Sequence, residues 1–226
     1  NNLALTTEST IPNEDCVSEI LSNGDTFYFS TTSGKTWKRT AAGVYSLVST
    51  NTNGAHKGCK LWQGYLYYAT QSKLGRITEA LASSESTWSS ESDSWNTFAT
   101  AGAHKPMYTI GSGLYIGDGN NVYLVDSTHT FIPDALDLPS QFTTSALDGL
   151  SDDLMIGTII GANVPYCKVF IWNRISPSWT GEDRVPGVGI NCFLKIDNMH
   201  VFQAGTKGRL YYWNGSEAVK LKKIKG

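Results

Sequence analysis

The 226-residue chain has few charged residues and no long apolar run. Charged side chains make up 17% of the sequence and the formal net charge is −2. This argues against a disordered chain or a coiled coil, since both are usually rich in Lys and Glu. The near-neutral balance gives no electrostatic reason to expect binding to nucleic acid or to an anionic membrane surface. No apolar run approaches the roughly 20 residues of a membrane-spanning helix. We therefore expect no nucleic-acid partner and no membrane insertion.

Cysteine is also scarce. The four copies are widely spaced and form no CxxC pair: Cys16, Cys59, Cys167 and Cys192. At least three sit in apolar, strand-like runs, so buried free thiols are the favoured interpretation, with a disulfide or metal set as the alternative. The chain begins at Asn1 and shows no signal-peptide pattern, from which we expect a processed product or a fragment of a longer protein.

Glycine and aromatic residues are abundant, with 22 Gly, 11 Tyr, 8 Phe and 7 Trp. Helix formers are few, whereas β-formers and turn formers are plentiful. One short motif also recurs: three mostly apolar or aromatic residues and then a small one. Its first residues are separated by 39, 48, 40 and 47 positions, and the five copies are residues 27–30, 66–69, 114–117, 154–157 and 201–204. The composition indicates an all-β chain, and the spacing indicates a repeat.

Each copy of the motif has the same neighbours. A turn containing Gly, Asn or Asp precedes it, a second strand-like run follows, and a more variable strand closes the unit. Four antiparallel strands repeating every 40 to 50 residues are typical of β-propeller blades. We expect the small residue to let neighbouring blades approach, and the bulky residues to fill the space between them. The predicted fold is a five-bladed β-propeller of four-stranded antiparallel blades, with a β-sandwich or jelly roll as the alternative.

The repeat also sets the expected domain organisation. Residues 1–14 are predicted to be a leader or linker, and residues 15–226 a single propeller domain. How the ring closes stays open, because the fifth unit contains all of its own strands. The predicted blades are approximately residues 15–53, 54–101, 102–142, 143–187 and 188–226.

The sequence gives little support for catalysis. A glycosidase propeller needs two carboxylates facing each other across the sugar, yet most Asp residues here lie in turns, where the side chain caps its own backbone. Asp118 and Asp152 are examples. The five arginines fall mostly on third strands or loops, unlike the convergent three of a sialidase. We expect no enzyme activity, no cofactor and no metal, with a carbohydrate-active enzyme as the rival hypothesis.

Two histidines are the first candidates for a polar site near the propeller axis. The tetrapeptide Gly-Ala-His-Lys occurs at residues 54–57 and 102–105, in each case just before the innermost strand of a blade. His56 and His104 are therefore predicted to be equivalent. Neutral imidazole is a common metal ligand, but no third ligand is repeated, so hydrogen bonding to backbone at a blade entrance is the favoured alternative.

Three tryptophans are candidates for contact with a ligand. Trp88 and Trp95 lie in the Ser-rich run 82–97, and Trp179 lies in the run 174–187. Exposed aromatic side chains suit sugar stacking or protein contact. The alternative is a solvated loop whose Trp residues pack down on the blade.

Segment 30–37 resembles the Asp-box hairpin of sialidase-type propellers, with Thr32 in place of the Asp; this box stabilises a turn and is not catalytic. Other stretches together resemble uncharacterised β-propeller segments of bacteriophage virion and tail-associated proteins and of environmental bacteria: 131–139, 154–158, 188–191 and 208–215. The resemblance implies an extracellular or virion-associated domain of a larger protein, and brings no catalytic residues. The resulting hypothesis is a non-enzymatic binding or display module that presents loops to a glycan or protein. A structural spacer without a ligand is a further alternative.

Overall fold

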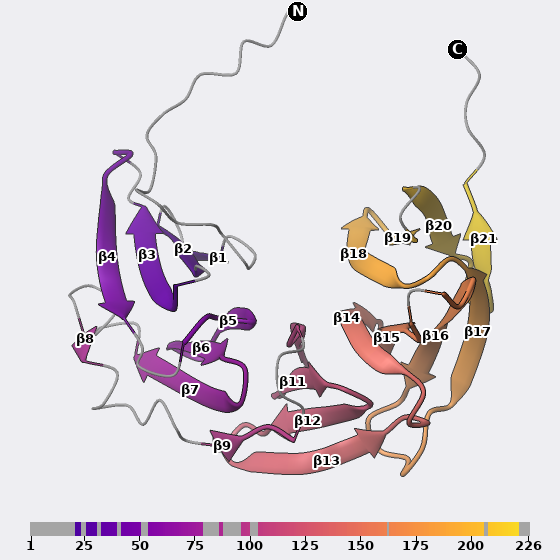
Figure 1. Ribbon diagram of the computed structural model, residues 1–226, viewed down its shortest axis with the longest axis horizontal. Helices are drawn as coiled ribbons and strands as arrows, with labels where there is room; N and C mark the ends of the chain where they lie inside the picture. Colours follow the sequence, from indigo (N-terminus) through magenta and orange to yellow (C-terminus); the bar gives the residue numbers. More distant parts are fainter. Residues whose placement is uncertain are drawn as a thin grey trace, which may run out of the picture. The chain divides into compact units, whose positions relative to one another are not determined.

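The computed structural model contains only β-strands and connecting segments in the part of the chain that it describes (Figure 1). The described residues are 21–23, 26–30, 33–39, 42–50, 54–78, 86–87, 96–99, 104–161, 163–205 and 208–221. Within them, no helix has the length and apolar character to cross a membrane. The chain divides into two compact units, Asn1–Gly102 and Ala103–Gly226.

The first unit contains two sheets. One has the strand order β1-β2-β3-β4-β8, and the other β5-β6-β7-β9. The strands of the first are β1 Leu21–Asn23, β2 Thr26–Ser30, β3 Lys35–Arg39, β4 Tyr45–Thr50 and β8 Ser86–Thr87. Those of the second are β5 Gly58–Trp62, β6 Tyr65–Ala69, β7 Lys73–Thr78 and β9 Asn96–Thr97. Val48 of β4 packs with Leu66 and Tyr68 of β6, which joins the two sheets through an apolar cluster.

The second unit contains three four-stranded antiparallel sheets, which follow one another along the chain. The first is β10 Met107–Ile110, β11 Gly113–Asp118, β12 Asn121–Val125 and β13 Phe131–Asp137. The second is β14 Thr143–Leu150, β15 Asp153–Ile159, β16 Tyr166–Trp172 and β17 Gly181–Pro186. The third is β18 Ile190–Ile196, β19 Met199–Ala204, β20 Arg209–Trp213 and β21 Ala218–Lys220.

The predicted blade architecture is confirmed for four sheets, but the count of five such blades is wrong. Four sheets are four-stranded and antiparallel, whereas the sheet of β1–β4 carries a fifth strand, β8, which pairs in parallel with β4. The strand comes from the Ser-rich run that the sequence assigned to the next blade. An open sheet edge presents unpaired N–H and C=O groups and so accepts a further strand, a pairing that no repeat spacing reveals.

Two small residues of the repeated motif, Gly117 and Gly157, lie at close approaches between neighbouring blades. A Cβ added to Gly117 would lie 2.4 Å from Cγ2 of Thr144 on the next blade, and one added to Gly157 would lie 2.8 Å from Cγ2 of Ile190. The predicted role of these glycines is therefore confirmed. Bulky residues fill the space between the sheets, as Tyr115 of β11 does against Trp172 of β16, with ring centroids 5.9 Å apart.

The fifth copy of the motif is displaced by one residue from its predicted position. In β14–β15, Ala146 pairs with Gly157 directly after a bulge, and in β18–β19 the corresponding pair is Cys192 with Gln203. The position of Gly157 is therefore occupied by Gln203, not by the predicted Ala204. A bulge adds one residue to one strand, and local residue patterns do not show which strand it enters.

Two smaller predictions have mixed outcomes. The segment resembling an Asp-box connects β2 and β3, and Gly34 there has φ 79°.

Cys59 and Cys167 are buried free thiols as expected, but Cys192 is an exposed free thiol. Its strand, β18, is apolar in sequence, and most of its residues are nevertheless exposed. Cys16 lies outside the described residues.

Candidate functional site

The loop 173–180, which connects β16 to β17, is held in one shape by its own side chains. Oδ1 of Asn173 accepts hydrogen bonds from the backbone N–H of Ile175 at 3.1 Å and of Ser176 at 2.8 Å. The indole Nε1 of Trp172 donates to the carbonyl of Ser176 at 2.8 Å. Asn commonly caps a turn by bonding backbone two or three residues onward. The sequence Asn-Arg-Ile-Ser therefore folds into a fixed turn.

Arg174 ties this loop to two neighbouring hairpins. The backbone of Arg174 has φ 66°. Residues other than Gly rarely adopt this conformation, and it persists only where the surrounding structure holds it. Its Nε donates to the carbonyl of Asp152 at 2.5 Å, in the turn between β14 and β15. Its guanidinium also lies over Gly111, in the turn between β10 and β11, because a Cβ there would be 2.9 Å from Nη1.

The fixed loop presents one large apolar side chain to solvent. Ile175 is 90% exposed, which is unusual for a β-branched aliphatic residue on a rigid turn. Trp179, at the other end of the loop, is half-buried and packs edge-to-face on Phe170 with ring centroids 5.2 Å apart. Apolar side chains presented on preorganised loops are typical contact points for proteins.

The predicted binding residues lie in different environments. His56 is fully buried, its ring lies 5.1 Å from that of Tyr68, and burial lowers its pKa to about 3. His104 is exposed, although it stands in the second copy of the same tetrapeptide. Their assignment to one polar site stays a prediction. Trp88 and Trp95 lie outside the described residues, so only Trp179 of the three tryptophans can be placed.

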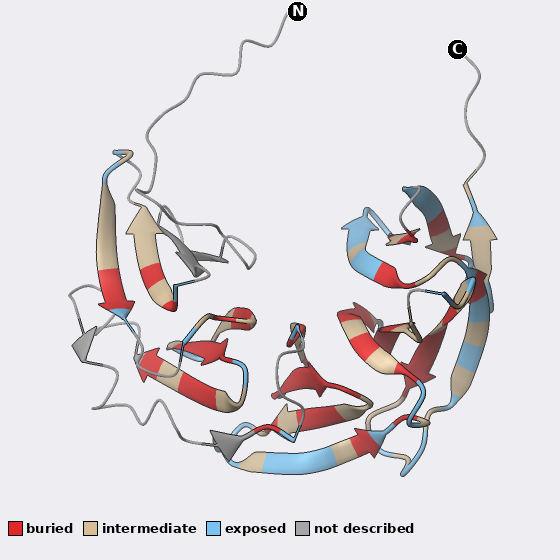
Figure 2. Cartoon of the chain, viewed as in Figure 1, coloured by how far each residue is buried: buried red, intermediate tan, exposed pale blue. Residues whose placement is uncertain are grey.

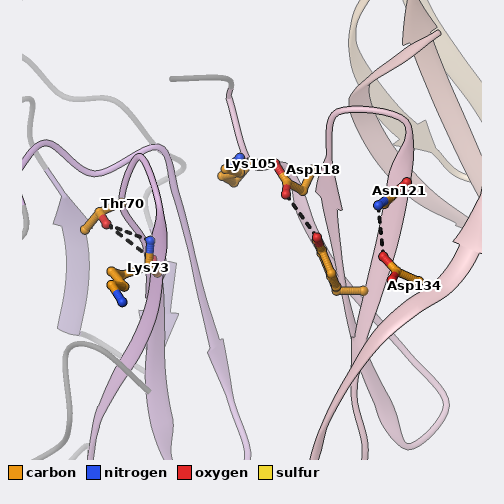
Figure 3. A network of polar contacts seen from close by, with 7 residues as sticks. Thr70, Lys73, Lys105, Asp118, Asn121 and Asp134 are labelled. Carbon is orange, nitrogen blue, oxygen red and sulfur yellow. Dashed lines mark hydrogen bonds and ion pairs between the residues drawn. The ribbon is translucent and has the colours of Figure 1, made fainter. Parts of the chain in front are cut away.

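Sequence reasoning missed a buried ion pair in the second unit. Lys105, just before β10, pairs with Asp118 at the end of β11, and both side chains are fully buried (Figure 3). Tyr123 donates to the other carboxylate oxygen of Asp118 at 3.2 Å. Burial lowers the pKa of Lys105, and the hydrogen bond and charge of Asp118 oppose this shift. Asp118 was expected to cap its own turn with its side chain. The repeat of a lysine in the two Gly-Ala-His-Lys tetrapeptides was the sequence feature that could have indicated a buried partner for it.

A second buried pair joins two blades. Nδ1 of His200 on β19 lies 3.0 Å from Oδ2 of Asp148 on β14, and both side chains are almost fully buried. Among the residues that the structure describes, no group of three or more His, Cys, Asp or Glu side chains could hold a metal ion. Because both ion pairs are shielded from solvent, they connect strands and blades and are not accessible to a ligand. The exposed loop 173–180 is therefore the candidate contact site.

Comparison with known proteins supports the fold but identifies no family. No family model matches the chain, and no curated protein matches it in sequence. Among solved structures, it is similar to a chain of the mitotic checkpoint complex, with 13% identity and a TM-score of 0.70 over 94% of this chain and 65% of that one. It is similar to the Pan2 WD40 domain of Neurospora crassa, with 12% identity and a TM-score of 0.61 over 91% of this chain and 65% of that one. A computationally designed protein, Ika8, matches with 10% identity and a TM-score of 0.62 over 92% and 61%.

These identities are too low to carry more than the fold, which is of the β-propeller type. The chain spans less than two thirds of the length of these three matched chains. The resemblance to phage proteins is not addressed by these structures and stays a prediction.

Proposed function

We propose that this chain is a non-enzymatic protein-binding module whose loop 173–180 contacts the partner. The observation that carries the proposal is the 90% exposure of Ile175 on a turn fixed by Asn173 and Arg174. A rigid loop loses little conformational entropy on binding, so most of the free energy gained by burying its apolar tip is retained. Full burial of an isoleucine side chain contributes about 1.5–3 kcal/mol.

The fold is consistent with this role. Solved structures similar to this chain include members of protein complexes: the mitotic checkpoint complex and the nidogen/laminin complex, the latter with 11% identity and a TM-score of 0.59 over 91% of this chain and 78% of that one. Propellers hold many unrelated functions, so the evidence for this chain must come from its own surface.

The proposed ligand is a protein rather than a glycan. Sugar recognition usually uses an exposed aromatic face together with polar side chains, whereas Trp179 packs on Phe170 and the exposed tip of the loop is aliphatic. An isoleucine fits an apolar pocket, and Arg174 beside it adds a positive charge. A virion or cell-surface setting comes only from the sequence resemblance and remains part of the proposal.

Selection from a displayed random-peptide library against the intact chain tests the proposal. Enriched peptides are then measured by calorimetry against the wild type and the Ile175→Asp variant. We expect Ile175→Asp to raise the dissociation constant about tenfold or more, because an apolar pocket excludes a carboxylate. Ile132→Asp is the matched control: Ile132 is also a partly exposed isoleucine of the second unit, but it lies on β13.

Thermal unfolding of both variants shows whether each retains the fold. Peptides that bind Ile175→Asp as tightly as the wild type would contradict the proposal, as would a selection that yields none. A glycan array and turnover assays on polysaccharides test the two alternative functions. If a sugar binds the wild type and the Ile175→Asp variant equally well, the glycan-binding hypothesis is favoured. Release of reducing sugar would favour an enzyme.

A further inference from the structure

The turn 214–217, which connects β20 to β21, begins with an Asn-Gly pair. Oδ1 of Asn214 accepts hydrogen bonds from the backbone N–H of Ser216 at 3.0 Å and of Glu217 at 2.9 Å. It also accepts one from the hydroxyl of Ser216 at 3.1 Å. The amide Nδ2 of Asn214 donates to Oε1 of Glu217 at 3.5 Å. Three donors therefore converge on one carbonyl oxygen.

The backbone nitrogen that follows this side chain belongs to a glycine. Gly215 has φ 106°, and nothing lies within 4 Å of the position that its Cβ would take. Glycine has more backbone freedom than any other residue. All four residues of the turn are exposed, so water reaches the side-chain amide (Figure 2). A nucleophile, a carbonyl group and its donors thus lie within four consecutive residues.

We propose that Asn214 is a site of spontaneous deamidation. Hydroxide takes the proton of the Gly215 N–H, and the nitrogen forms a bond to Cγ of Asn214 while an electron pair of the C=O bond moves onto Oδ1. When this pair returns, the bond between Cγ and Nδ2 breaks, and the amine takes a proton from water and leaves as ammonia. The cyclic succinimide that remains is opened by water to aspartate or isoaspartate. In sum, one amide and one water give one acid and one ammonia, without oxidation or reduction.

The three donors favour this attack because they surround the oxygen on which negative charge develops. Hydrogen bonds to a charged oxygen are stronger than those to a neutral one. The bonds to Oδ1 therefore stabilise the tetrahedral intermediate more than the starting amide, as in an oxyanion hole. Attack from within the same chain also avoids the entropy loss of bringing two molecules together. The folded turn, and not the Asn-Gly sequence alone, promotes the reaction.

The preceding blade contains a matched asparagine. Asn173 and Asn214 each follow a tryptophan that ends the third strand of a blade, and each caps the turn that comes next. The residue after Asn173 is Arg174, whose Nε donates to the carbonyl of Asp152. This side chain and its tether restrict the backbone nitrogen that would have to attack. We therefore expect Asn173 to keep its amide.

Deamidation at this position changes the start of β21. Isoaspartate adds a methylene group to the main chain and shortens the side chain, so the cap on the turn is lost. Directly after the turn, the backbone N–H of Ala218 donates to Oδ2 of Asp183 on the preceding blade at 2.7 Å. Formation of isoaspartate therefore loosens this contact between two blades, and the amide of Ala218 exchanges its hydrogen faster.

Incubation of the folded chain at about pH 8, followed by peptide mass spectrometry, tests the inference. Asn214 converts to aspartate and isoaspartate, faster as the pH rises, while Asn173 stays intact. Ser216→Ala slows the conversion about fivefold, because it removes one of the donors to Oδ1. Gly215→Ala slows it about tenfold or more, because a side chain restricts the attacking backbone. Thermal unfolding verifies that both variants fold.

The same incubation in denaturant separates the effect of the fold from that of the sequence. The unfolded chain no longer holds the donors on Oδ1, so the wild type and Ser216→Ala deamidate at equal rates. Three results would overturn the inference: an Asn214 that stays intact in the folded chain, a folded Ser216→Ala that reacts as fast as the wild type, or an Asn173 that reacts as fast as Asn214. The protein-binding proposal is separate, because it depends on Ile175.

Discussion

Asp148 and His200 meet across the boundary between two blades, with Oδ2 of the carboxylate 3.0 Å from Nδ1 of the imidazole. The strands that carry them, β14 and β19, belong to different sheets. Both side chains are nearly inaccessible to solvent. This buried polar pair helps to fix how the two sheets align, because each group left alone would be buried without a partner.

Removing Asp148 and removing His200 are expected to lower the free energy of unfolding by different amounts. His200→Leu leaves a buried carboxylate without its partner and is expected to destabilise the chain by about 3 kcal/mol or more. Asp148→Leu leaves one ring nitrogen of His200 without its partner and is expected to cost only about 1–2 kcal/mol. Urea unfolding of the single variants and of the double variant checks this. Equal and additive losses would show that the pair is not coupled.

The glycines between blades give a sharper test of packing. Gly117→Ala places a methyl group 2.4 Å from Cγ2 of Thr144 and should destabilise by about 1–3 kcal/mol, because one of the two blades has to move. Gly161→Ala is the control, since nothing lies within 4 Å of its added Cβ. Chemical denaturation measures both variants. A Gly117→Ala variant as stable as Gly161→Ala would contradict the close approach of the blades.

Gly117 and Gly157 also show how far the sequence could lead. Their places in a recurring motif predicted a small residue at these blade boundaries, because the reason for it is local, whereas the last blade carries Gln203 at the matching position. The alternation of turns and aromatic strands likewise predicted the four-stranded sheets. Neither prediction needed knowledge of residues far away in the chain.

Features that depend on distant partners could not be predicted in the same way. Lys57 and Lys105 each end a Gly-Ala-His-Lys tetrapeptide, so the sequence suggests the same role for both. The residue directly after the small residue of the motif differs, however: it is Thr70 in one blade and Asp118 in the other. Thr70 accepts a hydrogen bond from the backbone N–H of Lys73 at 3.2 Å, whereas Asp118 pairs with Lys105. The parallel pairing of β8 with β4 is another such case, because it joins residues far apart in sequence.

The exposed tip of loop 173–180 was missed for a different reason. The sequence drew attention to Trp179, since tryptophan is common at contact surfaces, but the ring packs on Phe170. Ile175, four residues earlier, looks like a core residue by type. The turn held by Asn173, Trp172 and Arg174 presents it to solvent instead.

His56 is expected to make stability depend on pH. Burial lowers its pKa in the folded chain from 6.5 to about 3, so below pH 6.5 the unfolded chain binds a proton that the folded chain does not. The free energy of unfolding therefore falls as the pH drops from 6.5 towards 3, by roughly 3 kcal/mol between pH 7 and pH 4 from this group. His56→Gln removes this part of the pH dependence, as followed by urea unfolding at each pH. His104→Gln, at an exposed site, retains it; equal pH profiles for the two variants would refute the assignment.

The cysteines are expected to differ widely in reactivity. Burial raises the pKa of Cys167 to about 12, and Cys59 is also buried, whereas Cys192 is exposed. The thiolate is the reactive form, so in a Cys16→Ser background a disulfide reagent at pH 8 should modify one thiol rapidly. Cys192→Ser abolishes this fast phase, and adding denaturant exposes the other two thiols. A fast phase that survives in Cys192→Ser would mean that Cys59 or Cys167 is reached by solvent, contradicting the packing between blades in that part of the chain.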